Sequence, residues 1–213
     1  MKLLFLFLWI PLTVQSQNAL RFQEEVNAIY KKYETLHEPE TGTIVFTGSS
    51  SIRLWNDLEQ RFPDAHIVNT GFGGSEASDL LAYSEPLILR YKPKKVFIYE
   101  GDNDIANKKR VNVVLTDFQK IIATIHQHNP NTQIVLLSAK PSPSRWHLRR
   151  RYKRLNRKIE TLAQRHSAVA YANIWDVMLE NGRPKAFLFT QDNLHMNAQG
   201  YDLWYSVIKN YIN

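Results

Sequence analysis

Short apolar runs alternate with longer amphipathic stretches from residue 18 to the end of the chain. Runs rich in β-branched residues and bounded by turn residues predict buried strands at 43–47, 66–70, 95–100, 133–138 and 168–174. Helical spacing of apolar residues predicts helices at 18–37, 50–60, 76–90 (divided by Pro86), 111–128 and 197–212, and one in a basic segment after residue 144. The polar stretch 101–107 is predicted to be a loop. This alternation predicts an α/β fold with a parallel sheet and helices on both faces.

The first 16 residues have the pattern of a secretory signal peptide. Lys2 precedes the apolar run LLFLFLWIP at 3–11, and Val14 and Ser16 suit the two small-residue positions before a cleavage site. An uncleaved anchor is the alternative, but the run is shorter than the roughly 20 residues that span a bilayer. We therefore predict cleavage after Ser16, export of the protein, a single domain over 17–213 and no stable membrane span.

The net charge of +7 is concentrated in one segment, RWHLRRRYKRLNRK at 145–158. Apolar residues recur within and after this segment at spacings of four and three, as on the buried side of an amphipathic helix. They are Leu148, Tyr152, Leu155, Ile159 and Leu162. The pattern predicts a helix with a solvated basic face rather than a nucleic-acid site. Attraction to acidic polysaccharide or anionic lipid stays open.

Polar or glycine-rich clusters follow the first three predicted strands, at 48–51, 71–74 and 101–104, and a fourth lies at 192–195. Because parallel strands share their carboxyl ends, the first three clusters are expected to meet at one edge of the sheet, where open α/β folds bind ligands. The glycines at 71–74 do not fit the G-x-G-x-x-G fingerprint of dinucleotide-binding proteins, because Glu76 occupies the position of its last glycine. No phosphate-loop motif is present either. The chain has no cysteine, which excludes disulfides and a thiol nucleophile. We predict neither a cofactor nor a metal.

Each cluster also has a purely structural interpretation. A serine after Gly48 can cap a helix, and the other glycines can form tight turns. Asn103 can satisfy backbone groups of its loop, and His195 can be a structural histidine. Asp102 and Asp104 resemble metal ligands, but the EF-hand spacing is absent.

Together, the clusters supply the parts of an acyl-transfer site. The Ser50 hydroxyl can act as nucleophile, His195 can take its proton, and Asp192, three residues before His195, can hold the imidazole Nδ1–H. The backbone N–H groups of Ser50 and Gly74 can bind an oxyanion, with the Asn103 amide as a third donor.

In this order the residues resemble the four conserved blocks of the SGNH (GDSL-type) hydrolase family. Those blocks are Gly-Asp-Ser, a glycine, G-x-N-D and D-x-x-H. They correspond here to 48–50, Gly74, 101–104 and 192–195. Ser50 stands two residues after Gly48, as the first block requires, but Ser49 replaces its aspartate. That aspartate is not the triad acid, so the replacement concerns the rigidity of the loop more than catalysis.

The resemblance implies a three-layer α/β/α sandwich around a flavodoxin-like, five-stranded parallel sheet. It also implies esterase, lipase or thioesterase activity without a metal. By position, Ser50 is implied as nucleophile, His195 as base and Asp192 as the residue that orients the base. The implied oxyanion donors are Ser50, Gly74 and Asn103.

We therefore expect an exported serine esterase that cleaves carboxylic esters through an acyl-enzyme, with carbohydrate O-deacetylation slightly favoured. Lysophospholipase or thioesterase activity on lipid acyl groups stays open, as does a glycan- or lipid-binding domain with an idle hydrolase-like site. The expected partner is a small-molecule, glycan or lipid ester and not a nucleic acid, and no oligomeric state is predicted. Several aromatic residues are predicted to belong mostly to the core, although they could line an open cleft. They are Trp55, Phe72, Trp146, Phe187 and Phe189.

Overall fold

The computed structural model describes residues 21–34 and 42–213, and the predicted signal peptide lies outside these ranges. At its centre is a five-stranded sheet, in the order β2-β1-β3-β4-β5, in which every pair of neighbours is parallel. The strands are β1 Ile44–Gly48, β2 Ile67–Gly71, β3 Lys95–Tyr99, β4 Gln133–Leu137 and β5 Val169–Ala172. This is the flavodoxin-like strand order, so the predicted fold class is confirmed.

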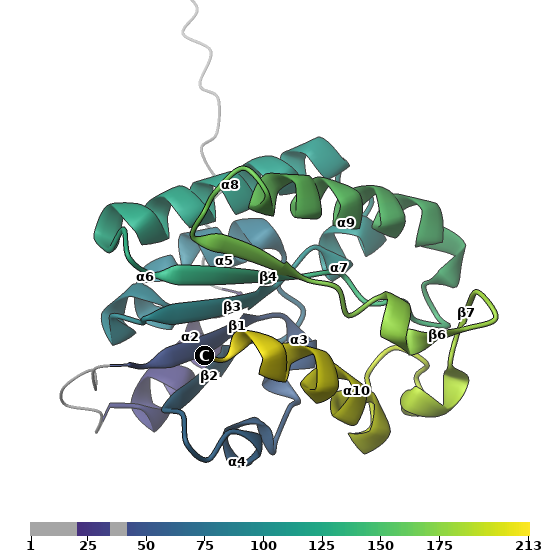
Figure 1. The fold of residues 1–213 in the computed structure, drawn as a ribbon, viewed down its shortest axis with the longest axis horizontal. Coiled ribbons are helices and arrows are strands. Elements are labelled where there is room, and N and C mark those ends of the chain that lie inside the picture. Colours follow the sequence, from purple (N-terminus) through teal and green to yellow (C-terminus); the bar gives the residue numbers. More distant parts are fainter. Residues whose placement is uncertain (1–20, 35–41) are drawn as a thin grey trace, which may run out of the picture.

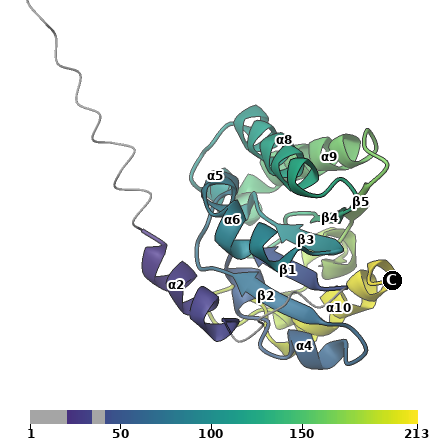
Figure 2. The same ribbon diagram turned by 90° about the vertical axis from the view of Figure 1, so that its left-hand side faces the viewer.

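Helices cover both faces of the sheet (Figure 1). They are α2 Gln23–Lys32, α3 Ser50–Arg53, α4 Leu58–Arg61, α5 Ala77–Ala82, α6 Ser84–Leu87, α7 Asp102–Ala106, α8 Val111–His128, α9 Arg149–Ala163 and α10 Ala198–Ile208. In Figure 2, α8 and α9 lie above the sheet, and α4 and α10 lie below it. A short antiparallel ribbon, β6 Leu179–Glu180 and β7 Arg183–Pro184, lies between β5 and α10 in the sequence.

Neighbouring residues of each strand pack into different cores. Val45 of β1 belongs to the core formed with α2, α5, α6, α8 and α9, whereas Phe46 belongs to the core formed with α3, α4 and α10. Every residue of β1 and β3 is buried. Strands with helices on both faces therefore appear in the sequence as continuous apolar runs, which is why all five were predictable.

Three predicted boundaries are wrong because local turns interrupt the helical pattern. The helix predicted at 50–60 is two short helices, α3 and α4, joined by a turn after Leu54. The stretch predicted to divide at Pro86 divides at Tyr83 instead. Pro86 lies in the first turn of α6, where its missing N–H removes no helical hydrogen bond. The predicted loop at 101–107 contains α7, which has two acidic residues in its first turn, a favourable place for negative charge.

The basic segment and the last helix follow their predicted patterns. In α9 the side chains of Tyr152, Leu155, Ile159 and Leu162 are buried. Asn197 caps α10, because its side-chain oxygen accepts a hydrogen bond from the Gly200 N–H at 3.2 Å. No helix within residues 21–34 and 42–213 is long and apolar enough to span a membrane.

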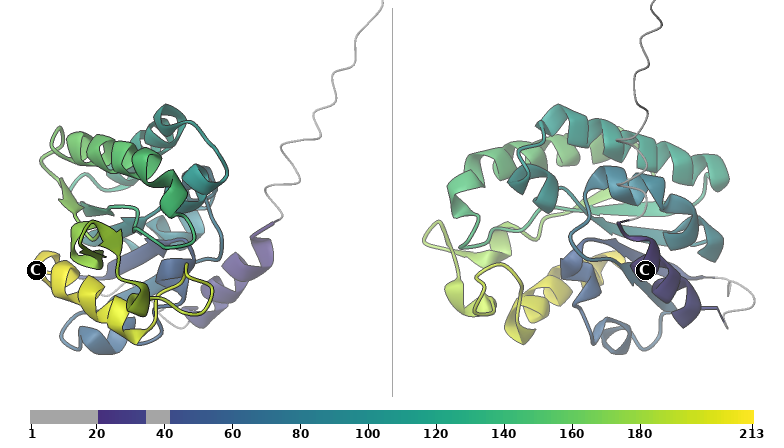
Figure 3. Two further views of the ribbon diagram at one scale, coloured as in Figure 1. Left: turned by 90° about the vertical axis from the view of Figure 1, so that its right-hand side faces the viewer. Right: turned by 180° about the vertical axis from the view of Figure 1, so that it is seen from behind.

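The first three polar clusters meet at the carboxyl edge of the sheet. Gly48 lies in register with Gly71 of β2 and with Tyr99 of β3, so these strands end side by side. The segment between β5 and α10, green to yellow in Figures 1 and 3, lies at this end of the molecule. It carries the fourth cluster to the same place.

Candidate active site

The chain leaves β1 through a turn that requires glycine. Gly48 has φ +125°, and a Cβ there would lie 2.0 Å from the carbonyl oxygen of Tyr99. Ser49 then takes the N-cap position of α3, and Ser50 is the first helical residue. The cap position that the sequence allowed for a serine after Gly48 thus belongs to Ser49 and not to Ser50, and the Ser49 side chain makes no capping hydrogen bond. Ser49 and Ser51 are each 2% exposed, whereas Ser50 is half-buried, so Ser50 is the most accessible of the three serines.

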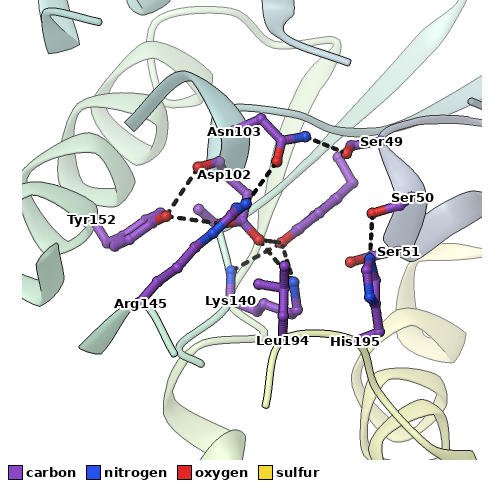
Figure 4. A network of polar contacts seen from close by, with 12 residues as sticks. Ser49, Ser50, Ser51, Asp102, Asn103, Lys140, Arg145, Tyr152, Leu194 and His195 are labelled. Carbon is purple, nitrogen blue, oxygen red and sulfur yellow. Dashed lines mark hydrogen bonds and ion pairs between the residues drawn. The ribbon is translucent and has the colours of Figure 1, made fainter. Parts of the chain in front are cut away.

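The His195 side chain contacts Ser50 (Figure 4) and, with its other ring nitrogen, Asp192. Its Nε2 atom is 3.0 Å from the Ser50 Oγ, and its Nδ1 atom is 2.5 Å from the Asp192 Oδ2. A carboxylate only accepts hydrogen bonds, so Nδ1 carries the proton in neutral histidine and Nε2 is left as an acceptor for the serine hydroxyl. The structure thus brings together the three residues that the sequence singled out for nucleophile, base and orienting acid.

Local hydrogen bonds hold Asp192 in place. Its Oδ1 atom accepts from the backbone N–H groups of Leu194 and His195, each at 2.9 Å, and from the Thr190 hydroxyl at 2.8 Å. Partial burial raises the pKa of Asp192, but these backbone donors and His195 outweigh it and hold that pKa well below its ordinary value. The residue is therefore ionised at neutral pH, although its side chain is 47% exposed.

The predicted oxyanion donors come from three separate segments. Within the described residues, the backbone N–H groups of Ser50 and Gly74 donate no hydrogen bond, so both are available to a ligand. Gly74 has φ +74°, which suits glycine. The neighbouring Gly73 N–H donates to the Glu25 carboxylate at 2.9 and 3.0 Å, so α2 helps to hold this turn.

Asn103, in α7, joins the other two segments. Its Nδ2 atom donates to the Ser49 Oγ at 2.7 Å and to the Ser75 carbonyl oxygen at 2.9 Å. Ser49 and Ser75 are the immediate neighbours of Ser50 and Gly74, so all three predicted donors lie in adjoining segments. Ser49 stands at the position where the family has aspartate. Its hydroxyl accepts a hydrogen bond from Asn103 and so connects the first sequence block to the third.

A buried charge network lies behind Asn103, and the sequence did not predict it (Figure 4). The Asp102 carboxylate accepts from Lys140 at 2.7 Å and from Arg145 at 2.6 Å. It also accepts from the hydroxyls of Tyr99 at 2.8 Å and Tyr152 at 2.9 Å. Burial would raise the pKa of Asp102, but the two cations reverse this effect and hold the pKa well below its ordinary value. Asp102 is therefore an anion in the interior of the protein.

A second buried carboxyl group, that of Glu100, is connected to Asn103 through Ser75. The Glu100 Oε1 atom accepts a hydrogen bond from the Ser75 hydroxyl at 2.6 Å, and the backbone carbonyl oxygen of Ser75 accepts one from the Asn103 side chain. Burial, and then the nearby charge of Asp104, raise the pKa of Glu100 well above its ordinary value. Asp104 in turn is 3.0 Å from the Lys109 Nζ. No group of His, Asp or Glu side chains in the described part of the chain is arranged to hold a metal ion.

Arg145 was missed because helical periodicity assigned the basic segment to a solvated helix face. Tyr152 was predicted to be buried, but without a polar partner, and Lys140 lies in the proline-rich stretch before that segment. Arg145 lies before the first turn of α9, so the periodic pattern does not apply to it. A signal was available in its position, since the proline-rich stretch 139–144 follows β4 at the same edge of the sheet as the other clusters.

The predicted aromatic residues lie mostly in the core. Trp55, Phe72 and Phe189 are buried, and Trp146 is half-buried. Phe187 is the exception, with 59% of its surface exposed. It lies close to the segment of the candidate base, because the Asn197 side chain donates to its carbonyl oxygen at 2.7 Å.

Solved structures share this fold over most of the chain. One, provisionally described as a platelet activating factor from Streptococcus pneumonia, is 25% identical with a TM-score of 0.79, covering 94% of this chain and 98% of that one. A GDSL-like lipase from Bacteroides thetaiotaomicron is 20% identical with a TM-score of 0.71, covering 86% and 96%. A variant of an acetyl-xylooligosaccharide esterase from Geobacillus Stearmophilus is 16% identical with a TM-score of 0.68, covering 81% and 94%.

A comparison with curated proteins gives no significant match. The family model of the GDSL-like lipases and acylhydrolases matches residues 42–203, a range that includes all four sequence blocks. This match covers most of the chain and confirms the resemblance stated from the sequence. The chain therefore belongs to the GDSL-like lipase/acylhydrolase family and is a hydrolase.

Proposed function

We propose that the protein is an exported serine esterase that acts through an acyl-enzyme on Ser50. The observation that carries this proposal is the chain of contacts from the Ser50 Oγ to His195 and on to Asp192, at 3.0 and 2.5 Å. The serine oxygen attacks the ester carbonyl carbon, and His195 Nε2 takes the hydroxyl proton. The same proton then passes to the alcohol as the ester C–O bond breaks. Water, deprotonated by His195, attacks the acyl-enzyme and releases the acid and Ser50.

The negative charge that develops on the carbonyl oxygen is bound by donors from three segments. The N–H groups of Ser50 and Gly74 are available without rearrangement. The Asn103 amide supplies the third donor. Of its two N–H hydrogens, the one that is bonded to the Ser49 hydroxyl would donate to the oxyanion instead, because Ser49 adjoins the nucleophile. Asp192 keeps His195 in the required tautomer and stabilises its charged form.

The proposed substrate is an acetylated carbohydrate, acted on outside the cytoplasm. Two structures with this fold are an acetyl-xylooligosaccharide esterase and a member of carbohydrate esterase family 3, which gives the carbohydrate ester its support. The basic start and short apolar run of residues 2–11 support export. A lipid acyl ester is the second candidate. The observation that favours it is the exposed Phe187, whose backbone contacts Asn197 in the segment that follows His195.

The test is a panel of nitrophenyl esters, acetylated oligosaccharides and lysophospholipids, assayed with Ser50→Ala and Ser51→Ala. We expect Ser50→Ala to lower kcat by at least about 10³-fold, because the nucleophile is lost. Ser51→Ala is the matched control and should keep most of the activity. Full turnover by Ser50→Ala would exclude this mechanism. Hydrolysis of lysophospholipids but not of acetylated sugars would contradict the carbohydrate substrate and favour a lipid acyl ester instead.

A further inference from the structure

The orientation of the Asn103 amide is determined by partners that cannot exchange roles. The Ser75 carbonyl oxygen can only accept a hydrogen bond, and it faces the Asn103 Nδ2 at 2.9 Å. The Arg145 guanidinium can only donate, and its Nη2 atom lies 3.1 Å from the Asn103 Oδ1. A flipped amide would place oxygen against oxygen and NH₂ against a cation. The two contacts therefore keep the N–H groups of Asn103 on the side of Ser49 and Ser50.

Arg145 is itself held by a buried anion. Its Nη1 atom donates to the Asp102 Oδ1 at 2.6 Å, while Nη2 reaches Asn103, so one planar guanidinium spans both residues. The Arg145 side chain is 19% exposed, and the Asp102 side chain is 5% exposed. In Figure 4, Arg145 extends from the far side of the network toward Asp102 and Asn103.

The network also carries an excess of positive charge. Lys140 donates to the other oxygen of Asp102 at 2.7 Å, and its side chain is only 2% exposed. Two cations thus face one carboxylate, and the net charge of this group is positive. Because a hydrogen bond from a charged donor to the amide oxygen draws electrons from the amide nitrogen, it makes the Asn103 N–H a stronger donor. Positive charge one amide away also stabilises negative charge that develops at the oxyanion.

We propose that Arg145 is a positioning residue of the reaction, which acts through Asn103. It fixes the side chain of Asn103 as an oxyanion donor and strengthens that donor, without touching the substrate. This inference rests on the proposed esterase function and adds to it a residue that lies outside the four sequence blocks. The effect belongs to the transition state, since the oxyanion forms only there, and it should change kcat far more than KM.

The test compares steady-state kinetics of Arg145→Met, Arg145→Lys, Asn103→Ala and the double variant Asn103→Ala/Arg145→Met, on the best ester of the panel. We expect Arg145→Met to lower kcat by about 10- to 100-fold, with KM within about twofold of the wild-type value. In the Asn103→Ala background the same change should lower kcat by less than about threefold, because the residue through which Arg145 acts is gone.

Arg145→Lys is the variant that answers the question if Arg145→Met does not fold. Lysine keeps a cation beside Asp102, but one ammonium cannot replace the planar two-armed contact, so kcat should still fall by about 10-fold. Arg149→Met is the matched control. In the described part of the chain, the Arg149 side chain contacts Trp146, through its carbonyl at 3.4 Å and its ring, and not Asp102 or Asn103, so kcat should not change.

Wild-type kcat in Arg145→Lys would overturn the proposal. So would losses from Asn103→Ala and Arg145→Met that multiply in the double variant, because two independent effects would then be at work. Either result leaves the Ser50 mechanism intact. Failure of that mechanism is a separate result, namely full turnover by Ser50→Ala.

Discussion

Two polar groups meet at Ser50, and the protein holds them in different ways. The first, the exposed group, is Asp192 and His195, whose side chains are 47% and 28% exposed. The second, the buried group, is Asp102, Lys140 and Glu100 with the contacts they make around Asn103, and these three residues are at most 3% exposed. Both groups are proposed to serve one reaction, the first by moving a proton and the second by holding the oxyanion donor.

The contacts that hold Asp192 join residues close in sequence, whereas the contacts around Asn103 join residues far apart in sequence. Asp192 is held by residues within three positions of it. Asn103, by contrast, contacts Ser75 and Ser49, 28 and 54 positions away, and Arg145, 42 positions away. We infer that the exposed group can be damaged without loss of fold, while damage to the buried group affects fold and activity together.

The largest effect is expected from Asp192→Asn, which breaks the exposed group alone. The Asn oxygen can still accept from the backbone, but its NH₂ then faces the His195 Nδ1 and favours the tautomer that cannot take the serine proton. We expect kcat to fall by about 10⁴-fold. Because the side chain is 47% exposed, the free energy of unfolding should change by less than about 1 kcal/mol.

Nitrophenyl ester kinetics and urea unfolding of the same samples measure both quantities. Gln191→Ala, an exposed change in the same turn, is the control and should alter neither. If Asp192→Asn kept a tenth of the activity, or unfolded in dilute urea, the proposed division between the two groups would be wrong.

The next effect is on stability, from Lys140→Met in the buried group. Removing this cation leaves the Asp102 carboxylate with one partner of opposite charge in the interior. We expect a loss of about 3–5 kcal/mol in the free energy of unfolding, the usual result of breaking a buried ion pair. Urea unfolding followed by tryptophan fluorescence measures this loss. Lys153→Met, on the exposed side of α9, should change stability by less than about 0.5 kcal/mol. Equal losses in the two variants would contradict the comparison.

The third effect is a change in the pH dependence of stability, from Glu100→Gln, and within any one pH unit it is the smallest of the three. Burial, and then Asp104, raise the pKa of Glu100 well above 4.5, so the native state binds a proton that the unfolded chain releases above about pH 5. Native stability from this group is complete at low pH and falls as pH rises, by up to about 1.4 kcal/mol per pH unit. Glutamine does not titrate, so this pH-dependent contribution to stability is absent from the Glu100→Gln variant.

The difference in unfolding free energy between Glu100→Gln and wild type should therefore shift in favour of the variant from pH 5 to pH 8. Urea unfolding at several pH values measures this shift, and Glu180→Gln, an exposed residue of β6, should show none. A difference that does not vary with pH would mean that Glu100 is ionised in the native state.

The fold was predictable because strands with helices on both faces appear as uniform apolar runs, and the corrections concerned only the divisions of helices and one short helix. The candidate triad was predictable for two reasons. Asp192 and His195 lie only three residues apart in the sequence, and Ser50 stands at the serine position of the family's first block. Phe187 shows the limit of composition, because nothing in the sequence distinguishes it from the buried Phe189. The network around Asp102 was not predicted, because Arg145 was grouped with the basic residues of the following helix. Its position after β4 was a signal for the site, but it did not reveal the partner of Arg145.

By itself, the sequence determined the order of strands and helices, the four polar blocks and the turn that presents Asp192 to His195. Hydrophobic periodicity and short-range hydrogen bonds carry that information, and both are local. Only the tertiary structure decided which serine is accessible, how the Asn103 amide is oriented and which arginine forms an ion pair with the buried Asp102. Those choices depend on contacts between residues far apart in the chain, which form when the strands align and their carboxyl ends meet.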